Sequence, residues 1–174
     1  MNKPEENTEI LHIKTVTLRY VAVEDRMHMA TKLEDGEQIV FWLTLRHCQR
    51  LLPALVKCLE GEKGIESAVE KSLAHSFRQK AAEGEKKEKP TAEPVLPSGE
   101  ERSLLPESVT VVCAGKGLAL FFPVEEGKKS AKLTLSLQEL RQWLAILYRQ
   151  FRKAEWPLDM WPDWFTGRSP HGMN

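Results

Sequence analysis

The feature that most constrains the fold is a short pattern that occurs twice in the chain. At 41–55, and again 92 positions later at 133–147, alternating apolar residues lead through a Thr or Ser into an amphipathic helical pattern. An acidic residue followed by glycine precedes each pattern, at 35–36 and at 126–127. Internal repeats determine the architecture of a chain, so they are interpreted first. We therefore expect two similar units, each with a strand that runs directly into a helix.

Alternation of apolar and polar residues predicts three antiparallel strands in each half. The acidic-glycine turns favour hairpins, because glycine adopts positive φ without strain. The six expected strands lie at 10–23, 27–33, 39–43, 109–113, 118–124 and 131–135. A three-stranded sheet with one helix leaves a sheet face and two edges uncovered. Two units would solve this problem either by sharing one sheet or by packing face to face, and both arrangements fit the sequence.

A helix start follows each third strand. Thr44 is the expected N-cap of a helix that ends near Glu60, and Ser136 with Glu139 is a capping box for the second helix. Pro53 lies inside the first helical pattern and predicts either a kinked helix or a break into two short ones. The expected fold class is α+β: an internally duplicated β-β-β-α unit, antiparallel sheets with one main helix per unit, an extra surface helix and an aromatic C-terminal tail.

Composition divides the chain into five segments. The polar N-terminus, 1–9, is expected to be disordered, and the first β-β-β-α unit with the extra helix takes 10–82. The charged, proline-containing stretch 83–105 has too few apolar residues to offset its ordering entropy, so it is interpreted as a flexible linker. The second unit takes 106–155, and a Trp/Pro-rich tail takes 156–174. Both units are expected to form one pseudo-symmetric domain.

The extra helix is expected over 64–82, where apolar residues recur at every fourth position. The residues of this stripe are Ile65, Val69, Leu73 and Phe77. One residue per turn is a thin apolar face for an amphipathic helix. The helix is therefore expected to lie on the surface of the core.

Charge and cysteine content argue against several classes of function. Lys plus Arg equals Asp plus Glu at 25 each, so no overall field draws the chain to nucleic acid or to an anionic membrane. No apolar stretch approaches the ~20 residues that span a bilayer, and the polar N-terminus is not a signal peptide, so the cytoplasm is the expected location. Cys48, Cys58 and Cys113 form no C-x-x-C pair and are interpreted as buried free thiols. No metal site, cofactor site or catalytic constellation is visible, and we expect the chain not to be an enzyme.

The C-terminal tail holds the strongest candidate binding residues. Three of the five tryptophans, Trp156, Trp161 and Trp164, lie close together with Phe165 among prolines that prevent a regular helix. Tryptophans this dense require burial. They can pack on the chain's own helices, close a homodimer, or dock in the groove of another protein, where Trp is enriched among the residues that carry binding energy.

A second set of residues predicts a nucleic-acid surface. Aromatic and cationic side chains are expected on the sheet face opposite the core, with further arginines on the second helix. The set is Trp42, Lys32, Phe121, Lys132, Arg141, Arg149 and Arg152. Stacking and phosphate neutralisation by such residues is how single strands are bound. Tandem sheet-plus-helix units are similar in architecture to the purine-rich-element and Whirly-type single-strand binders, whose units have four strands where three are expected here.

These observations favour a non-enzymatic interaction or assembly module that docks through its aromatic tail. The expected partner is a second copy of the chain or another protein. Single-stranded nucleic-acid binding is the alternative, less favoured because the net charge is zero.

Overall fold

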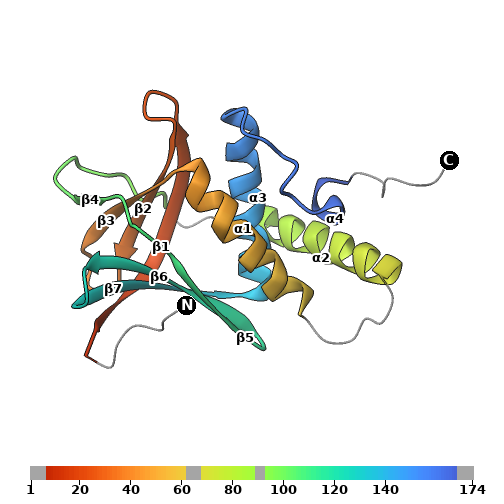
Figure 1. The fold of residues 1–174 in the computed structure, drawn as a ribbon, viewed down its shortest axis with the longest axis horizontal. Coiled ribbons are helices and arrows are strands. Elements are labelled where there is room, and N and C mark those ends of the chain that lie inside the picture. Colours follow the sequence, from red (N-terminus) through yellow and green to blue (C-terminus); the bar gives the residue numbers. More distant parts are fainter. Residues whose placement is uncertain (1–6, 62–67, 89–92, 168–174) are drawn as a thin grey trace.

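The computed structural model describes residues 7–61, 68–88 and 93–167. In these residues the chain has an α+β fold with a seven-stranded mixed sheet and four helices (Figure 1). The strands are β1 Glu9–Val21, β2 Arg26–Leu33, β3 Gln38–Leu43, β4 Arg102–Leu104, β5 Thr110–Ala114, β6 Gly117–Glu125 and β7 Lys129–Ser136. The helices are α1 Leu45–Glu60, α2 Ala68–Glu88, α3 Leu137–Lys153 and α4 Asp163–Thr166.

The two expected three-stranded meanders lie side by side in one sheet. Its strand order is β4-β3-β2-β1-β7-β6-β5. Within each meander the neighbouring strands are antiparallel, as the alternation predicts. The meanders are joined by parallel pairing of residues 9–12 of β1 with 129–132 of β7. Of the two arrangements left open by the sequence, the structure therefore has the shared sheet.

Helices α1 and α3 lie on the same side of the sheet, and α2 lies farther out, beyond α3 (Figure 1). The sheet is curved around the core, so that side chains from its two halves contact each other. The Phe41 ring of β3 lies 5.0 Å from the Phe122 ring of β6, between centroids. Leu52 of α1 and Leu144 of α3 are also fully buried. The apolar residues of both meanders and both main helices thus form one continuous core.

Both main helices begin with the expected caps. The Thr44 side chain accepts a hydrogen bond from the backbone N–H of His47, while His47 Nδ1 accepts one from the backbone N–H of Thr44 at 3.0 Å. Ser136 and Glu139 exchange the equivalent pair of hydrogen bonds at the start of α3. Helix α1 runs unbroken across Pro53, whose side chain is exposed. The alternative of two short helices is therefore wrong.

The stretch 83–105 differs from the flexible linker expected from the sequence. Residues up to Glu88 are the last turns of α2, and residues 102–104 form β4. Val95 is buried against Ala30 on the sheet face opposite the helices. Its backbone N–H also donates to Thr17 Oγ1 at 2.9 Å. The described part of this stretch that follows α2, 93–104, therefore contacts the sheet through a buried valine and a backbone hydrogen bond.

Helix α2 extends six residues beyond its expected end, and its large described apolar residues face outward. Leu73 is 57% exposed and Phe77 is 71% exposed, whereas His75, Gln79 and Ala82 are buried against α3 and α4. The other two residues of the predicted stripe fall outside what is described, because Ile65 and the Val69 side chain are not placed. The polar face is inside because α3 satisfies it: Gln79 Nε2 donates to the carbonyl oxygen of Arg141 at 2.9 Å.

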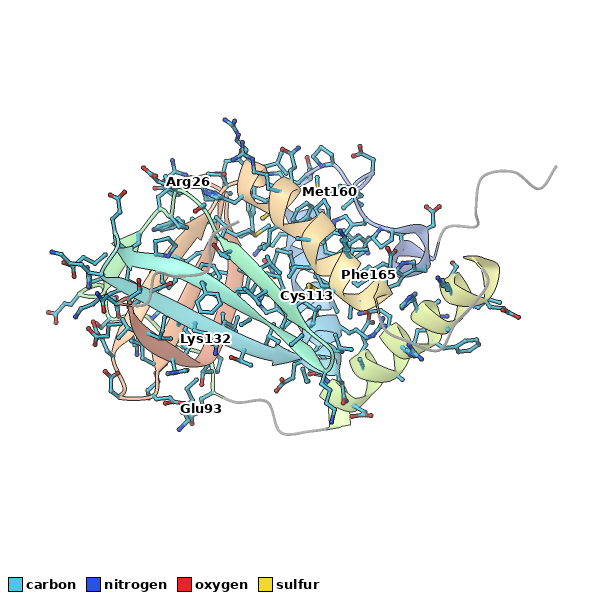
Figure 2. The ribbon with its side chains drawn as sticks, turned by 60° about the horizontal axis from the view of Figure 1, so that its bottom comes forward. Arg26, Glu93, Cys113, Lys132, Met160 and Phe165 are labelled. Carbon is cyan, nitrogen blue, oxygen red and sulfur yellow. A yellow bond between two sulfur atoms is a disulfide. The ribbon has the colours of Figure 1, made fainter. Side chains whose placement is uncertain are left out.

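A disulfide joins Cys58, in the last turn of α1, to Cys113 of β5, with their Cα atoms 5.6 Å apart (Figure 2). The interpretation as buried free thiols is therefore correct only for Cys48, which is fully buried. Burial raises the pKa of the Cys48 thiol to about 12. The two bonded cysteines are 55 positions apart and come together only through tertiary packing, so no spacing rule pairs them.

Candidate functional site

Strand β1 has a free edge over most of its length. Residues 13–21 pair with β2 on one side. On the other side β7 pairs only with residues 9–12, and no described strand continues along β1 beyond that point. A strand edge without a partner presents a row of backbone N–H and C=O groups that can pair with another chain.

The hydrogen bond of Tyr20 establishes which groups face this edge. Its backbone N–H donates to Gln150 Oε1 of α3 at 2.9 Å, so the backbone groups of Tyr20 point away from β2. In an antiparallel pair the backbone groups of successive residues alternate between the two sides. The N–H and C=O groups of Leu18 and Val16 therefore point the same way as those of Tyr20, toward the free edge.

The free edge borders a groove of about 1140 Å³. Its floor is the outer surface of α3, and its sides are β1 and the last turns of α2, which flank α3 in Figure 1. The β1 residues on the lining are 15–18, and Tyr148 with Phe165 adds aromatic surface. The groove therefore combines unpaired backbone groups, apolar surface and charged side chains.

Two cations and three acids line this groove. Glu139 is engaged in the cap of α3, and Glu83 accepts a hydrogen bond from Gln79 Nε2 at 2.9 Å. Glu93 is exposed. Burial lowers the pKa of Lys86 below its ordinary value, and repulsion from Arg149 lowers this pKa further. The cationic groups of α2 and α3 thus lie close enough on the groove lining for Arg149 to disfavour the charged form of Lys86.

The structure buries the predicted docking residues of the tail in the chain's own core. Trp156, Trp161 and Trp164 are 7%, 3% and 8% exposed. Phe151 of α3 packs edge-on against both Trp156 and Trp161. Phe165 is half-buried, contacts Trp161 and lines one end of the groove. The indole rings are therefore part of the folded chain and are not available as free anchors for a partner.

Arg141, assigned to the nucleic-acid alternative, is 3% exposed. Its Nη1 donates to the backbone oxygen of His75 at 3.3 Å, and its Nη2 lies 3.0 Å from His75 Nδ1. The guanidinium also lies over the Trp164 ring, 5.6 Å from its centroid. This arginine holds α2 and the tail on α3, and a phosphate cannot reach it.

The remaining residues of that alternative do not form one surface. Trp42 is half-buried, its Nε1 donates to Ser103 Oγ at 2.7 Å, and its ring packs against the Val95 patch. Phe121 is buried, with Lys132 Nζ 5.8 Å from its ring centroid (Figure 2). Lys32 and Arg152 are exposed on different elements. Neither aromatic ring of the set is fully exposed, since Phe121 is buried and Trp42 is half-buried.

The described residues contain no group of three or more His, Cys, Asp or Glu side chains arranged to hold a metal ion. In the same residues no helix has both the length and the apolar character that crossing a bilayer requires.

Sequence reasoning did not identify the free edge, although a signal for it is present. The first strand was expected over 14 residues, 10–23, while the third strand of the second unit was expected over only five, 131–135. A long strand beside a short neighbour must leave part of one edge unpaired. The site further depends on Gln150 and Lys86, which helical periodicity does not distinguish from other surface residues.

Comparison of the chain with protein-family models, curated proteins and solved structures finds no match to any of them.

Proposed function

We propose that this chain is a non-enzymatic interaction module that binds an extended segment of a partner protein in the groove between β1 and α2, by adding that segment as a strand to the free edge of β1. The single observation that carries this proposal is the orientation of the Val16 and Leu18 backbone groups, which follows from the Tyr20–Gln150 hydrogen bond. Backbone pairing at a sheet edge recognises an extended polypeptide whatever its side chains, and pockets beside the edge supply the selectivity.

The dimensions fit such a ligand. The groove-lining residues 15–18 of β1 extend over about 13 Å at ~3.3 Å per residue, which accommodates about four paired residues of a partner segment. Val16 and Leu18 can exchange four hydrogen bonds with it, each contributing about 0.5–1.5 kcal/mol net. Backbone pairing alone therefore falls short of the roughly 8 kcal/mol of micromolar binding. Contacts with the α3 floor must supply the remainder.

The test uses a displayed library of random peptides about eight residues long, selected against the intact protein. Val16→Pro is the key variant, because it removes a groove-facing N–H and no β1–β2 hydrogen bond. Val16→Ala is its matched control, because it shortens the side chain and keeps the N–H. We expect selected peptides to bind the wild type and V16A and to lose binding to V16P.

Two readouts keep the test independent of any loss of stability in V16P. Bound peptide should slow hydrogen exchange of the Val16 and Leu18 amides, while the amides that bond to β2 change little. N-methylation of alternate peptide residues should abolish binding, and methylation of the residues between them should not. Peptides that bind without protecting these two amides would contradict the proposal, as would a library that yields no binder.

A second copy of the chain is another occupant that this experiment detects. A dimer that is lost in V16P and retained in V16A would identify the partner as the chain itself. The nucleic-acid alternative receives no support from the geometry, because Arg141 is buried and Trp42 is packed beneath the 93–104 segment.

We also infer that the two meander-helix units arose by internal duplication. Supporting this inference, 41–55 and 133–147 each form a strand, a capped junction and a helix, and β3 and β7 hold the same place in their meanders. The test is superposition of the Cα atoms of the two units. Thr44 and Ser136 should then fall in register, and a shift of either cap against the preceding strand would contradict a common origin.

A further inference from the structure

Resting on the proposed function, we infer that the groove selects a partner segment that carries an acidic side chain, whose carboxylate is bound between Lys86 of α2 and Arg149 of α3. Both side chains line the groove that the segment would occupy. One acidic side chain of the partner would thus be recognised in addition to its extended backbone.

The two cations have no acidic partner among the described residues, which supports the inference. No hydrogen bond or ion pair to an acid is found for either one within the described residues. Lys86 is partly buried and so has lost some of the hydration that stabilises its charge. This burial lowers the pKa of Lys86, and repulsion from Arg149 lowers it further. A single carboxylate between the two would offset both effects.

The acids of the groove are committed elsewhere. The carboxylate of Glu139 accepts the backbone N–H of Ser136 at 2.8 Å, and that of Glu83 accepts the amide of Gln79. Moving either one to Lys86 would break a helix cap or a side-chain hydrogen bond. Glu93 is exposed, so its carboxylate already has access to solvent where it lies. The charge that completes the site is therefore assigned to the ligand.

The positions of the two cations relative to the free edge of β1 also support this inference. Arg149 immediately precedes Gln150, which binds Tyr20 at the end of the free edge. Lys86 approaches from α2, on the opposite side of the groove from β1. Side chains of a bound strand alternate in direction, so every second one points either to the floor or outward. An acidic residue at one floor-facing position would lie between the two cations, and an acid one position away would not.

The experiment compares each selected peptide with its acid-to-amide analogue, Glu→Gln or Asp→Asn, against four variants. Lys86→Gln and Arg149→Gln remove the two charges. Lys80→Gln and Arg152→Gln are matched controls, because both side chains are exposed on the same helices and neither lines the groove. For the wild type and the controls, the amide analogue should bind roughly tenfold more weakly, as expected for a charge-assisted hydrogen bond. For K86Q and R149Q this preference should largely disappear.

The outcomes separate this inference from the function on which it rests. Peptides that protect the Val16 and Leu18 amides and bind equally well with acid or amide would overturn the acidic preference alone. Failure of every peptide to protect those amides would overturn both. Oligo-thymidylate is tested in the same way as a phosphate probe. If it binds and loses affinity in R149Q but not in R152Q, the cation pair is a phosphate site and the carboxylate assignment is wrong.

Discussion

The indole N–H of Trp156 donates a hydrogen bond to Oδ1 of Asp25, 2.9 Å away. The residue that follows α3 by a few positions is thereby attached to the turn between β1 and β2. The Tyr20 hydroxyl donates to the same carboxylate oxygen at 2.7 Å, and the Tyr20 and Trp156 rings pack edge to face. The tail is therefore attached to the β1–β2 hairpin through Trp156.

Truncation after Lys153 should destabilise the protein severely. It removes Trp156, Trp161 and Trp164, and burying one large side chain is worth roughly 1.5–3 kcal/mol. The loss is comparable with the ~5–15 kcal/mol stability of a whole domain. We expect aggregation or a much lower melting temperature by differential scanning calorimetry. Truncation after Gly167 is the control and should change the melting temperature little. Unchanged melting of the longer truncation would mean that the tail is not part of the core.

Attachment of the tail should weaken in acid. Hydrogen bonds from Tyr20 and Trp156 lower the pKa of Asp25 below its ordinary value. A group whose pKa is lower when folded stabilises the fold above its unfolded pKa, and this contribution is lost as the pH falls through the folded value. Tryptophan fluorescence should therefore report loosening of the tail below about pH 4. Asp25→Asn keeps an acceptor and tolerates the positive φ of this position, so it should flatten that pH dependence. An identical acid transition in D25N would assign the change to other groups.

Reduction of the Cys58–Cys113 disulfide should lower stability by up to about 4 kcal/mol, the loop-closure value for residues 55 positions apart. Chemical denaturation with and without reductant measures the difference, and C58S/C113S should match the reduced protein. Cys48 should remain unreactive toward thiol reagents until the chain unfolds, because it is fully buried with a raised pKa. Reactive thiols at Cys58 and Cys113 in the native, unreduced protein would show that the bond does not form.

Val95→Ala should loosen the segment that crosses the outer sheet face. The valine is buried against Ala30 and Val40, whereas the neighbouring Leu96 is 77% exposed. V95A should therefore increase cleavage by a Glu-specific protease at Glu100 and Glu101, and Leu96→Ala should not. Equal and rapid cleavage of the wild type and both variants would favour the flexible linker expected from composition.

The orientation of α2 can be tested with two substitutions on opposite faces. Phe77→Ser should change the free energy of unfolding by no more than about 0.5 kcal/mol, as is usual for an exposed site. Ala82→Asp places a charge in a site that is 3% exposed and should destabilise the protein by well over 1 kcal/mol. If urea titrations showed a larger loss of stability for F77S than for A82D, the apolar stripe of α2 would face the core.

Local patterns were sufficient to predict most of the fold. Alternation identifies the six strands of the two meanders, and Thr44 and Ser136 mark the helix starts, because these signals depend on residues close in sequence. The order of the strands could not be predicted in the same way. Pairing of β1 with β7 depends on how two helices share one core, and no local pattern encodes that.

The errors have a common physical cause. Leu73 and Phe77 were judged by their own hydrophobicity. The side of α2 that packs on α3 is instead the one with His75 and Gln79, which form hydrogen bonds with Arg141. The free edge beside Val16 was missed for a similar reason, since the difference in length between the two strands is informative only once β1 and β7 are known to be neighbours.

Strand β4 has a consequence for solubility. It pairs in parallel with residues 39–41 of β3 and so occupies the edge at which the sheet would otherwise present an apolar strand to solvent. The opposite edge is β5, only five residues long and attached to α1 through Cys113. Growth of the sheet by addition of strands from other molecules is therefore restricted to a three-residue strand at one end and to a short, disulfide-anchored strand at the other. A chain that lost residues 102–104 would expose the longer edge of β3 at the first of these ends, which gives these three residues a protective value out of proportion to their length.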